Sequence, residues 1–176
     1  AMAENTFAMS ASSHDQIKFL SIDYEKFKNY GEIIIDKNGY KIASAGLPLN
    51  NNSIKIFDQR NKELDEGKVG YIFIKSDSLF DGYYNNQKLT DESFYNNWFN
   101  TGDLGFFYGG ELYVTGRKKE IIIVAGENIY PQDIEKVINN SDGCIEGRNV
   151  AFGIQDNRVG TEKVIVIAEI YEKEKN

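Results

Sequence analysis

The chain has 176 residues, of which 41% are hydrophobic and 27% charged, and its formal net charge is -7. This composition excludes a disordered polymer and disfavours general nucleic-acid binding, because nucleic acids attract basic surfaces. The single cysteine excludes an internal disulfide, and no apolar run approaches the roughly 18 residues of a membrane helix. We therefore expect a cytoplasmic protein that has no membrane span and folds as one or two small domains.

The first half of the chain predicts short antiparallel strands joined by turns. A short helix is expected after Asp23, which would cap it, and Gly31 would end it. The pair Asn38-Gly39 favours a hairpin between the segments on either side of it. The strands are expected over 17–22, 31–36, 40–46, 54–56 and 71–76. Strands at this spacing predict a small antiparallel β-barrel-like subdomain.

The second half of the chain changes character. A short helix capped by Thr90 is expected to include Ser93 and Phe94. The pair Gly109-Gly110 predicts a hairpin. An uninterrupted buried strand is expected over 120–126, then a helix that opens at Tyr130-Pro131, then two strands around a polar turn. The fold class is therefore α+β, with a β-barrel-like part followed by a smaller α+β part.

Two side chains near the Gly109-Gly110 hairpin could recognise a nucleotide. Asp103 follows Gly102, and a carboxylate there can accept hydrogen bonds from a vicinal diol such as a ribose. Arg117 offers a planar set of donors suited to phosphate or hydroxyl oxygens. The alternative is that Asp103 closes its own turn and Arg117 is a surface charge. Spacing alone favours this simpler alternative.

Other polar residues are weaker candidates. Glu4 could ligate Mg²⁺, which takes one or two carboxylates together with phosphate oxygens, although a surface acid is the simpler interpretation. Lys119 lies where the two halves meet, and it could exchange partners if the halves rotate. His14 is the only histidine and is expected to be incidental. The sequence contains no Ser-His-Asp set, zinc spacing or P-loop.

Several segments, in a fixed order, resemble the adenylate-forming enzymes, a family that comprises acyl-CoA synthetases, luciferases and the adenylation domains of peptide synthetases. TGDLGFFYGGELYVTGRKKE (101–120) followed by IIIVAGENIYPQDIE (121–135) resembles the junction between the two domains of this family. GYIFIKSDSLFDGYYNN (70–86) and SAGLPLNNNSIKIFD (44–58) resemble the segments before it. AENTFAMS (3–10) resembles the end of a Tyr-Gly-x-Thr-Glu motif, so the resemblance covers nearly the whole chain.

Three features are most similar to one branch of the family, the fatty acyl-AMP ligases. They are AENT at 3–6, the extra segment IKFLSIDYEKFKNYGEIIIDKNGYKIAS at 17–44, and YPQDIE at 130–135. Some coenzyme A ligases carry a lysine at the position of Ile123, and its absence agrees with this branch. Gly126 would lie where the thiol-bearing arm of the acyl acceptor approaches.

The resemblance implies roles for five residues. Asp103 would bind the ribose hydroxyls of ATP, and Arg117 would contact the ribose or a phosphate. Val114 would form an apolar wall near the nucleotide. Glu4 would support Mg²⁺ at the phosphates. Lys119 would be the hinge residue about which a small C-terminal domain turns between the two half-reactions.

The resemblance also implies that the sequence is a C-terminal fragment of a longer enzyme. Residues 1–116 would be the end of the large adenylation domain, with an insertion near 16–31. Residues 117–120 would be the hinge, and 121–176 the first part of the mobile C-terminal domain. The phosphate-binding loop and the terminal catalytic lysine of the family lie outside the sequence, so the fragment alone is expected to be inactive and to self-associate.

The function implied is ATP-dependent activation of a fatty acid as an acyl-adenylate, with Mg²⁺, for transfer to an acyl carrier protein. An acyl-CoA ligase, which would use coenzyme A as the acceptor, is one alternative. The other is a non-catalytic adenylate-binding or scaffolding module built on the same fold.

Overall fold

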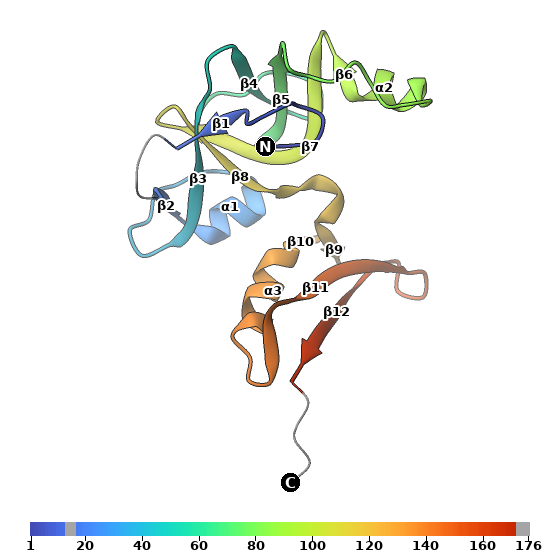
Figure 1. The fold of residues 1–176 in the computed structure, drawn as a ribbon. Helices are drawn as coiled ribbons and strands as arrows, with labels where there is room; N and C mark the ends of the chain where they lie inside the picture. Colours follow the sequence, from blue (N-terminus) through green and yellow to red (C-terminus); the bar gives the residue numbers. More distant parts are fainter. Residues whose placement is uncertain (13–16, 172–176) are drawn as a thin grey trace. The chain divides into compact units, whose positions relative to one another are not determined.

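A computed structural model describes residues 1–12 and 17–171, and the chain divides into two compact units (Figure 1). The first unit is Ala1–Arg117 and the second is Lys118–Asn176. The fold is α+β and mostly antiparallel, as predicted. His14 and the first residue of the expected insertion near 16–31 lie outside the described residues, as do 172–176.

The first unit is an antiparallel sheet that curls into a half-barrel, and this confirms the expected barrel-like subdomain. Its strand order is β1-β3-β8-β7-β5-β4, with β2 also paired to β3 and β6 to β7. The strands are β1 (Ser10–Ala11), β2 (Phe19–Ile22), β3 (Tyr40–Pro48), β4 (Asn52–Phe57), β5 (Gly70–Ser76), β6 (Phe94–Tyr95), β7 (Trp98–Tyr108) and β8 (Glu111–Arg117).

The core of the first unit is built by the apolar side chains of neighbouring strands. Ile72 and Ile74 of β5 are 4% and 1% exposed, and Phe99 of β7 is 1% exposed. β4 and β7 pair with β5 on its two sides, so β5 is an inner strand of the sheet. Met9, Ile54, Ile56 and Leu112 complete this cluster. The central strands therefore form a well-packed support for the residues of β7 and β8.

The expected helix after Asp23 is α1 (Tyr24–Tyr30), and both of its predicted ends are confirmed. The Asp23 carboxylate accepts a hydrogen bond from the backbone N–H of Lys26 at 3.0 Å. Gly31 has a φ of 64°, the left-handed conformation that ends helices, and this favours glycine there.

The predicted hairpin around Asn38-Gly39 is wrong. Residues 31–36 form only isolated bridges, and β3 pairs instead with β2. This pairing places Ile22 opposite Tyr40, and Ile22 is fully buried. A favourable turn pair is a local preference, whereas burial of apolar side chains depends on distant segments and decides the strand partner here.

The helix expected to be capped by Thr90 is α2 (Gln87–Ser93), which begins earlier than predicted and excludes Phe94. The N-cap is Asn86, whose side chain accepts a hydrogen bond from Leu89 N at 3.1 Å. Thr90 lies inside the helix, where its hydroxyl donates to the Asn86 carbonyl at 3.1 Å. The prediction failed because two residue types that both cap helices occur close together.

The second unit combines two hairpins and one helix. After a short 3-10 turn, η1 (Lys118–Glu120), come β9 (Ile122–Val124), β10 (Glu127–Ile129), α3 (Pro131–Asn139), β11 (Cys144–Asp156) and β12 (Thr161–Ile170). The helix opening at Tyr130-Pro131 and the two final strands are confirmed. Among the described residues no helix is long and apolar enough to cross a bilayer.

The uninterrupted strand expected over 120–126 is wrong. β9 ends at Val124, and the chain reverses through Ala125 and Gly126, whose φ angles are 50° and 85°. It then returns as β10, which pairs antiparallel with β9. A run of apolar residues does not reveal such a tight turn, because only the glycine marks it in the sequence.

Candidate functional site

Asp103 lies in a distorted part of the long strand β7 rather than in an isolated turn. From Asn100 to Leu104, β7 advances four residues while β5 advances only two, from Phe73 to Tyr71. Such a bulge bends the strand and redirects its side chains. The carboxylate of Asp103 is therefore aimed by an irregularity in the sheet.

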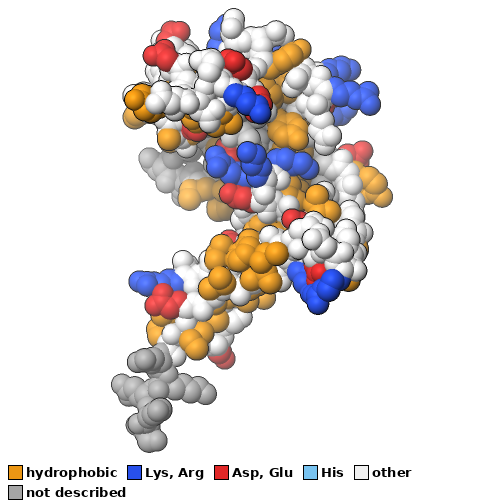
Figure 2. Space-filling model, turned by 90° about the vertical axis from the view of Figure 1, so that its right-hand side faces the viewer, with side chains coloured by type: hydrophobic (Ala, Val, Ile, Leu, Met, Phe, Trp, Pro, Cys, Tyr) orange, Lys and Arg blue, Asp and Glu red, His pale blue; other side chains and the backbone are white. Residues whose placement is uncertain are grey.

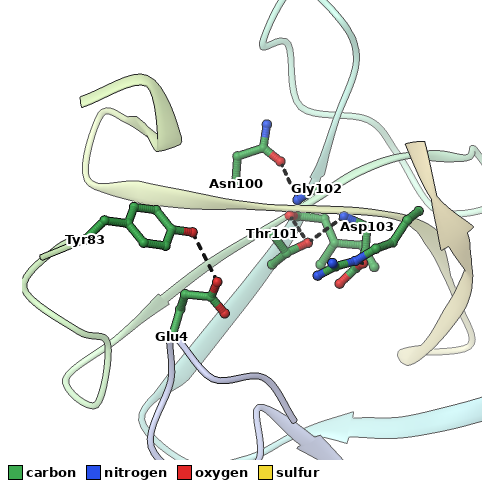
Figure 3. Close-up of polar contacts among 8 residues, drawn as sticks. Glu4, Tyr83, Asn100, Thr101, Gly102 and Asp103 are labelled. Atoms are coloured by element: carbon green, nitrogen blue, oxygen red, sulfur yellow. Dashed lines mark hydrogen bonds and ion pairs between the residues drawn. The ribbon is translucent and has the colours of Figure 1, made fainter. Parts of the chain in front are cut away.

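Short hydrogen bonds fix the backbone of this bulge (Figure 3). The backbone N–H of Gly102 donates to the Asn100 side-chain oxygen at 2.9 Å, and that of Asp103 donates to the Thr101 hydroxyl at 3.0 Å. The Thr101 hydroxyl in turn donates to the Ile72 carbonyl of β5 at 3.0 Å. Gly102 has a φ of 77°, which favours glycine at this position.

Arg117 lies opposite Asp103 in the register of β7 and β8. Its Nε donates to Oδ1 of Asp103 at 2.8 Å, and the two side chains are 52% and 27% exposed. The structure thus brings together the acid and the base at the two ends of the Gly109-Gly110 hairpin. The pair offers a carboxylate acceptor for sugar hydroxyls beside a guanidinium donor for hydroxyl or phosphate oxygens.

Glu4 lies in the same unit and faces a residue that the sequence did not single out. The hydroxyl of Tyr83 donates to Oε1 of Glu4 at 3.1 Å (Figure 3). Burial raises the pKa of the Tyr83 hydroxyl, and the hydrogen bond to the Glu4 carboxylate raises it further. The positive charge of Arg117 acts on this pKa in the opposite direction. Glu4 and Arg117 therefore both act on the hydroxyl of Tyr83, in opposite directions.

Glu4 is the residue that the sequence analysis expected to bind a magnesium ion. Among the described residues, no cluster of three or more His, Cys, Asp or Glu side chains is arranged to hold a metal ion. The contact of Glu4 with Tyr83 uses Oε1, so Oε2 would be the atom offered to a metal ion. Mg²⁺ commonly takes one or two carboxylates and completes its shell with phosphate oxygens and water.

The other candidate residues are one residue of β8 and two of the second unit. Val114 is on β8 opposite Gly105, and it is 43% exposed. Lys119 is exposed within η1 and lines a cleft of about 370 Å³ in the second unit. Gly126 occupies the β9–β10 turn, where an added Cβ would meet no atom within 4 Å. Its positive φ of 85° is therefore sufficient reason for glycine.

Two positions with defined roles in the geometry were missed from the sequence. Tyr83 is one of two adjacent tyrosines in GYYNN, and nothing local separates it from Tyr84. Thr161 accepts from the backbone N–H of Ala125 at 2.8 Å and donates to the Ile123 carbonyl at 2.9 Å, which fastens the β9–β10 turn to β12. Both depend on contacts between segments that are distant in the sequence.

Comparison with known proteins places these features in a family, although no protein-family model matches the chain. The 4-hydroxyphenylalkanoate adenylyltransferase of Mycobacterium bovis is 34% identical over 172 residues, which cover 89% of this chain and 27% of that protein. The 2-succinylbenzoate–CoA ligase of Bacillus licheniformis is 42% identical over 99 residues, which cover 56% of this chain and 20% of the ligase.

Solved structures agree with these relatives. A structure from a study of fatty acyl-adenylate ligases from E. coli and L. pneumophila has a TM-score of 0.84 and 30% identity, and the match covers 99% of this chain and 32% of that one. ATP-bound MatB from Rhodopseudomonas palustris has a TM-score of 0.64 and 28% identity, with 79% of this chain and 28% of that one covered.

The chain spans about a quarter of the length of the curated relatives that it matches. Those relatives are ligases and adenylyltransferases, and the structural match with the fatty acyl-adenylate ligase extends over both units. The curled sheet that carries Asp103 and Arg117, together with the α+β unit after it, is thus shared with these enzymes. The chain belongs to the adenylate-forming superfamily of ligases.

Proposed function

We propose that the chain is the C-terminal portion of an ATP-dependent fatty acyl-AMP ligase of the cytoplasm. In this reaction the carboxylate oxygen of a fatty acid attacks the α-phosphorus of ATP, and the bond to the pyrophosphate leaving group breaks. The products are acyl-adenylate and pyrophosphate. A thiolate on an acyl carrier protein then attacks the acyl carbon and releases AMP. The structural likeness to a fatty acyl-adenylate ligase supports this choice within the family.

The observation that carries the proposal is the contact between Asp103 and Arg117 across β7 and β8. Asp103 would accept hydrogen bonds from the ribose hydroxyls, because its carboxylate can serve two neighbouring donors. Arg117 would turn part of its guanidinium to the ribose or a phosphate. The bulge at Gly102 holds the carboxylate in place before the nucleotide arrives, which lowers the entropy cost of binding it.

Glu4 would hold Mg²⁺ through Oε2, together with phosphate oxygens of ATP. The bound metal would neutralise part of the negative charge that develops on the leaving pyrophosphate. Val114, with its exposed side chain on β8, would form an apolar wall beside the nucleotide.

The division of the chain between Arg117 and Lys118 supports a hinge at 117–120, with Lys119 as the residue that turns. In this proposal 1–116 belongs to the large adenylation domain and 121–176 to the mobile C-terminal domain. Rotation would let one site serve the adenylation and then the transfer to the thiol. Gly126, in the exposed β9–β10 turn, would lie along the approach of the thiol-bearing arm.

The test uses the full-length protein that contains this chain. Asp103→Ala is expected to lower kcat/KM for ATP in pyrophosphate release by about 100-fold, because the ribose loses its acceptor. Asp65→Ala, which changes an exposed acid of the same unit, serves as the matched control and is expected to change nothing. An Asp103→Ala variant that matches the wild type in both rate and affinity for ATP would contradict the assignment of Asp103 as the ribose-binding residue.

The acyl acceptor separates this proposal from its rivals. The wild-type protein is given ATP, a fatty acid and either holo carrier protein or coenzyme A, and the acylated product is identified by mass spectrometry. Acylation of the carrier alone is expected. Formation of acyl-coenzyme A would support the acyl-CoA ligase, and adenylate binding without pyrophosphate release would support a non-catalytic module. Residues 1–176 alone are expected to release no pyrophosphate.

A further inference from the structure

The Glu4 carboxylate has one hydrogen-bond donor within the part of the chain that the structure describes, and that donor is Tyr83 at 3.1 Å. The contact uses Oε1 rather than Oε2. A hydrogen bond to an ionised group is stronger than one between neutral groups, so it restricts the rotation of the carboxylate.

The ring of Tyr83 is held by an aromatic contact. It lies edge-on against Phe80, with ring centroids 4.8 Å apart and an interplanar angle of 76°. Phe80 packs in the same manner on Phe99, at 5.4 Å, and Phe99 is 1% exposed. The hydroxyl of Tyr83 is thus anchored through two rings to the core of the first unit.

The backbone of Tyr83 is held as firmly as its ring. Its N–H donates to the hydroxyl of Thr90 in α2 at 2.9 Å. Gly82, just before it, lies so close to Thr90 that an added Cβ would be 2.8 Å from the Thr90 methyl group. This close approach needs glycine, and it sets the direction in which Tyr83 leaves the chain.

The loop that carries Glu4 is fastened to the same segment. The N–H of Phe80 donates to the Glu4 carbonyl at 2.9 Å, and the N–H of Thr6 donates to the Ser78 carbonyl at 2.9 Å. Both partners of the Tyr83–Glu4 contact are therefore fixed by a few residues between Ser78 and Tyr83. A contact between two mobile surface side chains would not have these backbone hydrogen bonds to hold both partners.

We propose that Tyr83 is a positioning residue for the metal site, which holds Oε1 of Glu4 so that Oε2 faces the ion bound with the nucleotide phosphates. The inference rests on the proposed function, since it assumes that Glu4 is the metal ligand. Groups that orient metal ligands in this way commonly affect metal affinity by about 10-fold or more.

The first experiment measures the metal directly in the full-length protein. Mn²⁺ binding in the presence of a non-hydrolysable ATP analogue is followed by electron paramagnetic resonance. Tyr83→Phe, which removes only the hydroxyl, is expected to weaken Mn²⁺ binding by about 10-fold. The matched control is Tyr84→Phe, whose side chain is 93% exposed, and it is expected to bind Mn²⁺ like the wild type. Equal Mn²⁺ affinity in Tyr83→Phe and the wild type would overturn the inference.

The second experiment asks whether Tyr83 acts through Glu4. Glu4→Gln is expected to weaken Mn²⁺ binding strongly, and adding Tyr83→Phe to it is expected to cause no further loss. The melting temperature is expected to stay unchanged in Tyr83→Phe. A full additional loss in the double variant, or a melting temperature that falls while Mn²⁺ affinity holds, would assign Tyr83 a purely structural role.

The two proposals fail in different ways. If the protein binds Mn²⁺ with the nucleotide analogue but releases no pyrophosphate, the proposed ligase reaction is wrong. The Mn²⁺ affinities of Tyr83→Phe and Glu4→Gln then still decide whether Tyr83 positions the metal ligand. If it forms acyl-adenylate but Tyr83→Phe leaves its Mg²⁺ requirement unchanged, the ligase proposal stands and the role of Tyr83 is rejected.

Discussion

In the first unit Phe73, Phe99 and Phe106 are no more than 2% exposed, whereas in the second unit Ile154 of β11 and Ile167 of β12 are 50% and 59% exposed. Both units contain strands with consecutive apolar residues, such as YIFI in β5 and VIVIA in β12. β5 and β7 have strand partners on both sides, while β11 and β12, as far as the structure describes them, pair only with each other.

Hydrophobic side chains accordingly gather on the surface of the second unit (Figure 2). Its most exposed apolar residues are Val137, Val150, Ile154, Val159, Ile167, Ile170 and Tyr171. Apolar strands alone therefore do not make a core, because a strand face is buried only where another layer packs on it. The candidate nucleotide site lies on the first unit, whose core side chains are well buried and can hold the site residues in place.

The largest effect is expected from opening the core of the first unit. Phe99→Ala in the chain of residues 1–176 should lower the free energy of unfolding by about 3–5 kcal/mol, because it leaves a cavity and removes the ring contacts with Phe80 and Phe94. The fluorescence of Trp98, the sole tryptophan, follows the unfolding of this unit in denaturant. Tyr84→Ala is the exposed control. A loss below about 1 kcal/mol for Phe99→Ala would show that the unit is less well packed than described.

A smaller effect is expected in the second unit. Ile122 is 1% exposed, and Ile122→Ala should cost that unit about 2–5 kcal/mol. The change should speed amide hydrogen exchange in β11 and β12 while the Trp98 transition stays in place. Ile123→Ala, at a neighbour that is 44% exposed, is the control. If Ile122→Ala destabilised the Trp98 transition by the same amount as the second unit, the two units would unfold together and would not differ in stability.

The smallest effect on stability is expected at the exposed face of the second unit. Ile167→Thr keeps the β-branched shape and should change the free energy of unfolding by no more than about 0.5 kcal/mol. It should weaken the self-association that exposed apolar side chains predict for the chain, as measured by sedimentation velocity. Gln155→Thr, at an exposed polar residue of β11, is the control. A chain that is monomeric at high concentration would contradict this prediction.

Much of the fold could be predicted because its signals are local. Asp23 and Gly31 mark the ends of α1, Pro131 opens α3, and Gly109-Gly110 turns β7 into β8. The errors occurred where two local signals competed or where a distant partner decided. The strand after Gly39 pairs with β2, and Asn86 rather than Thr90 caps α2.

In the candidate site, too, the sequence indicated some residues, while the tertiary structure decided which of them are in contact. The sequence by itself named Asp103, Arg117 and Glu4 from their residue types and from a family resemblance. Tertiary structure alone joined Asp103 to Arg117 across two strands and brought Tyr83, 79 residues away in the chain, to the Glu4 carboxylate. Local propensities act over a few residues, whereas these contacts depend on strand register and on the packing of Phe80 and Phe99, which no short stretch of sequence encodes.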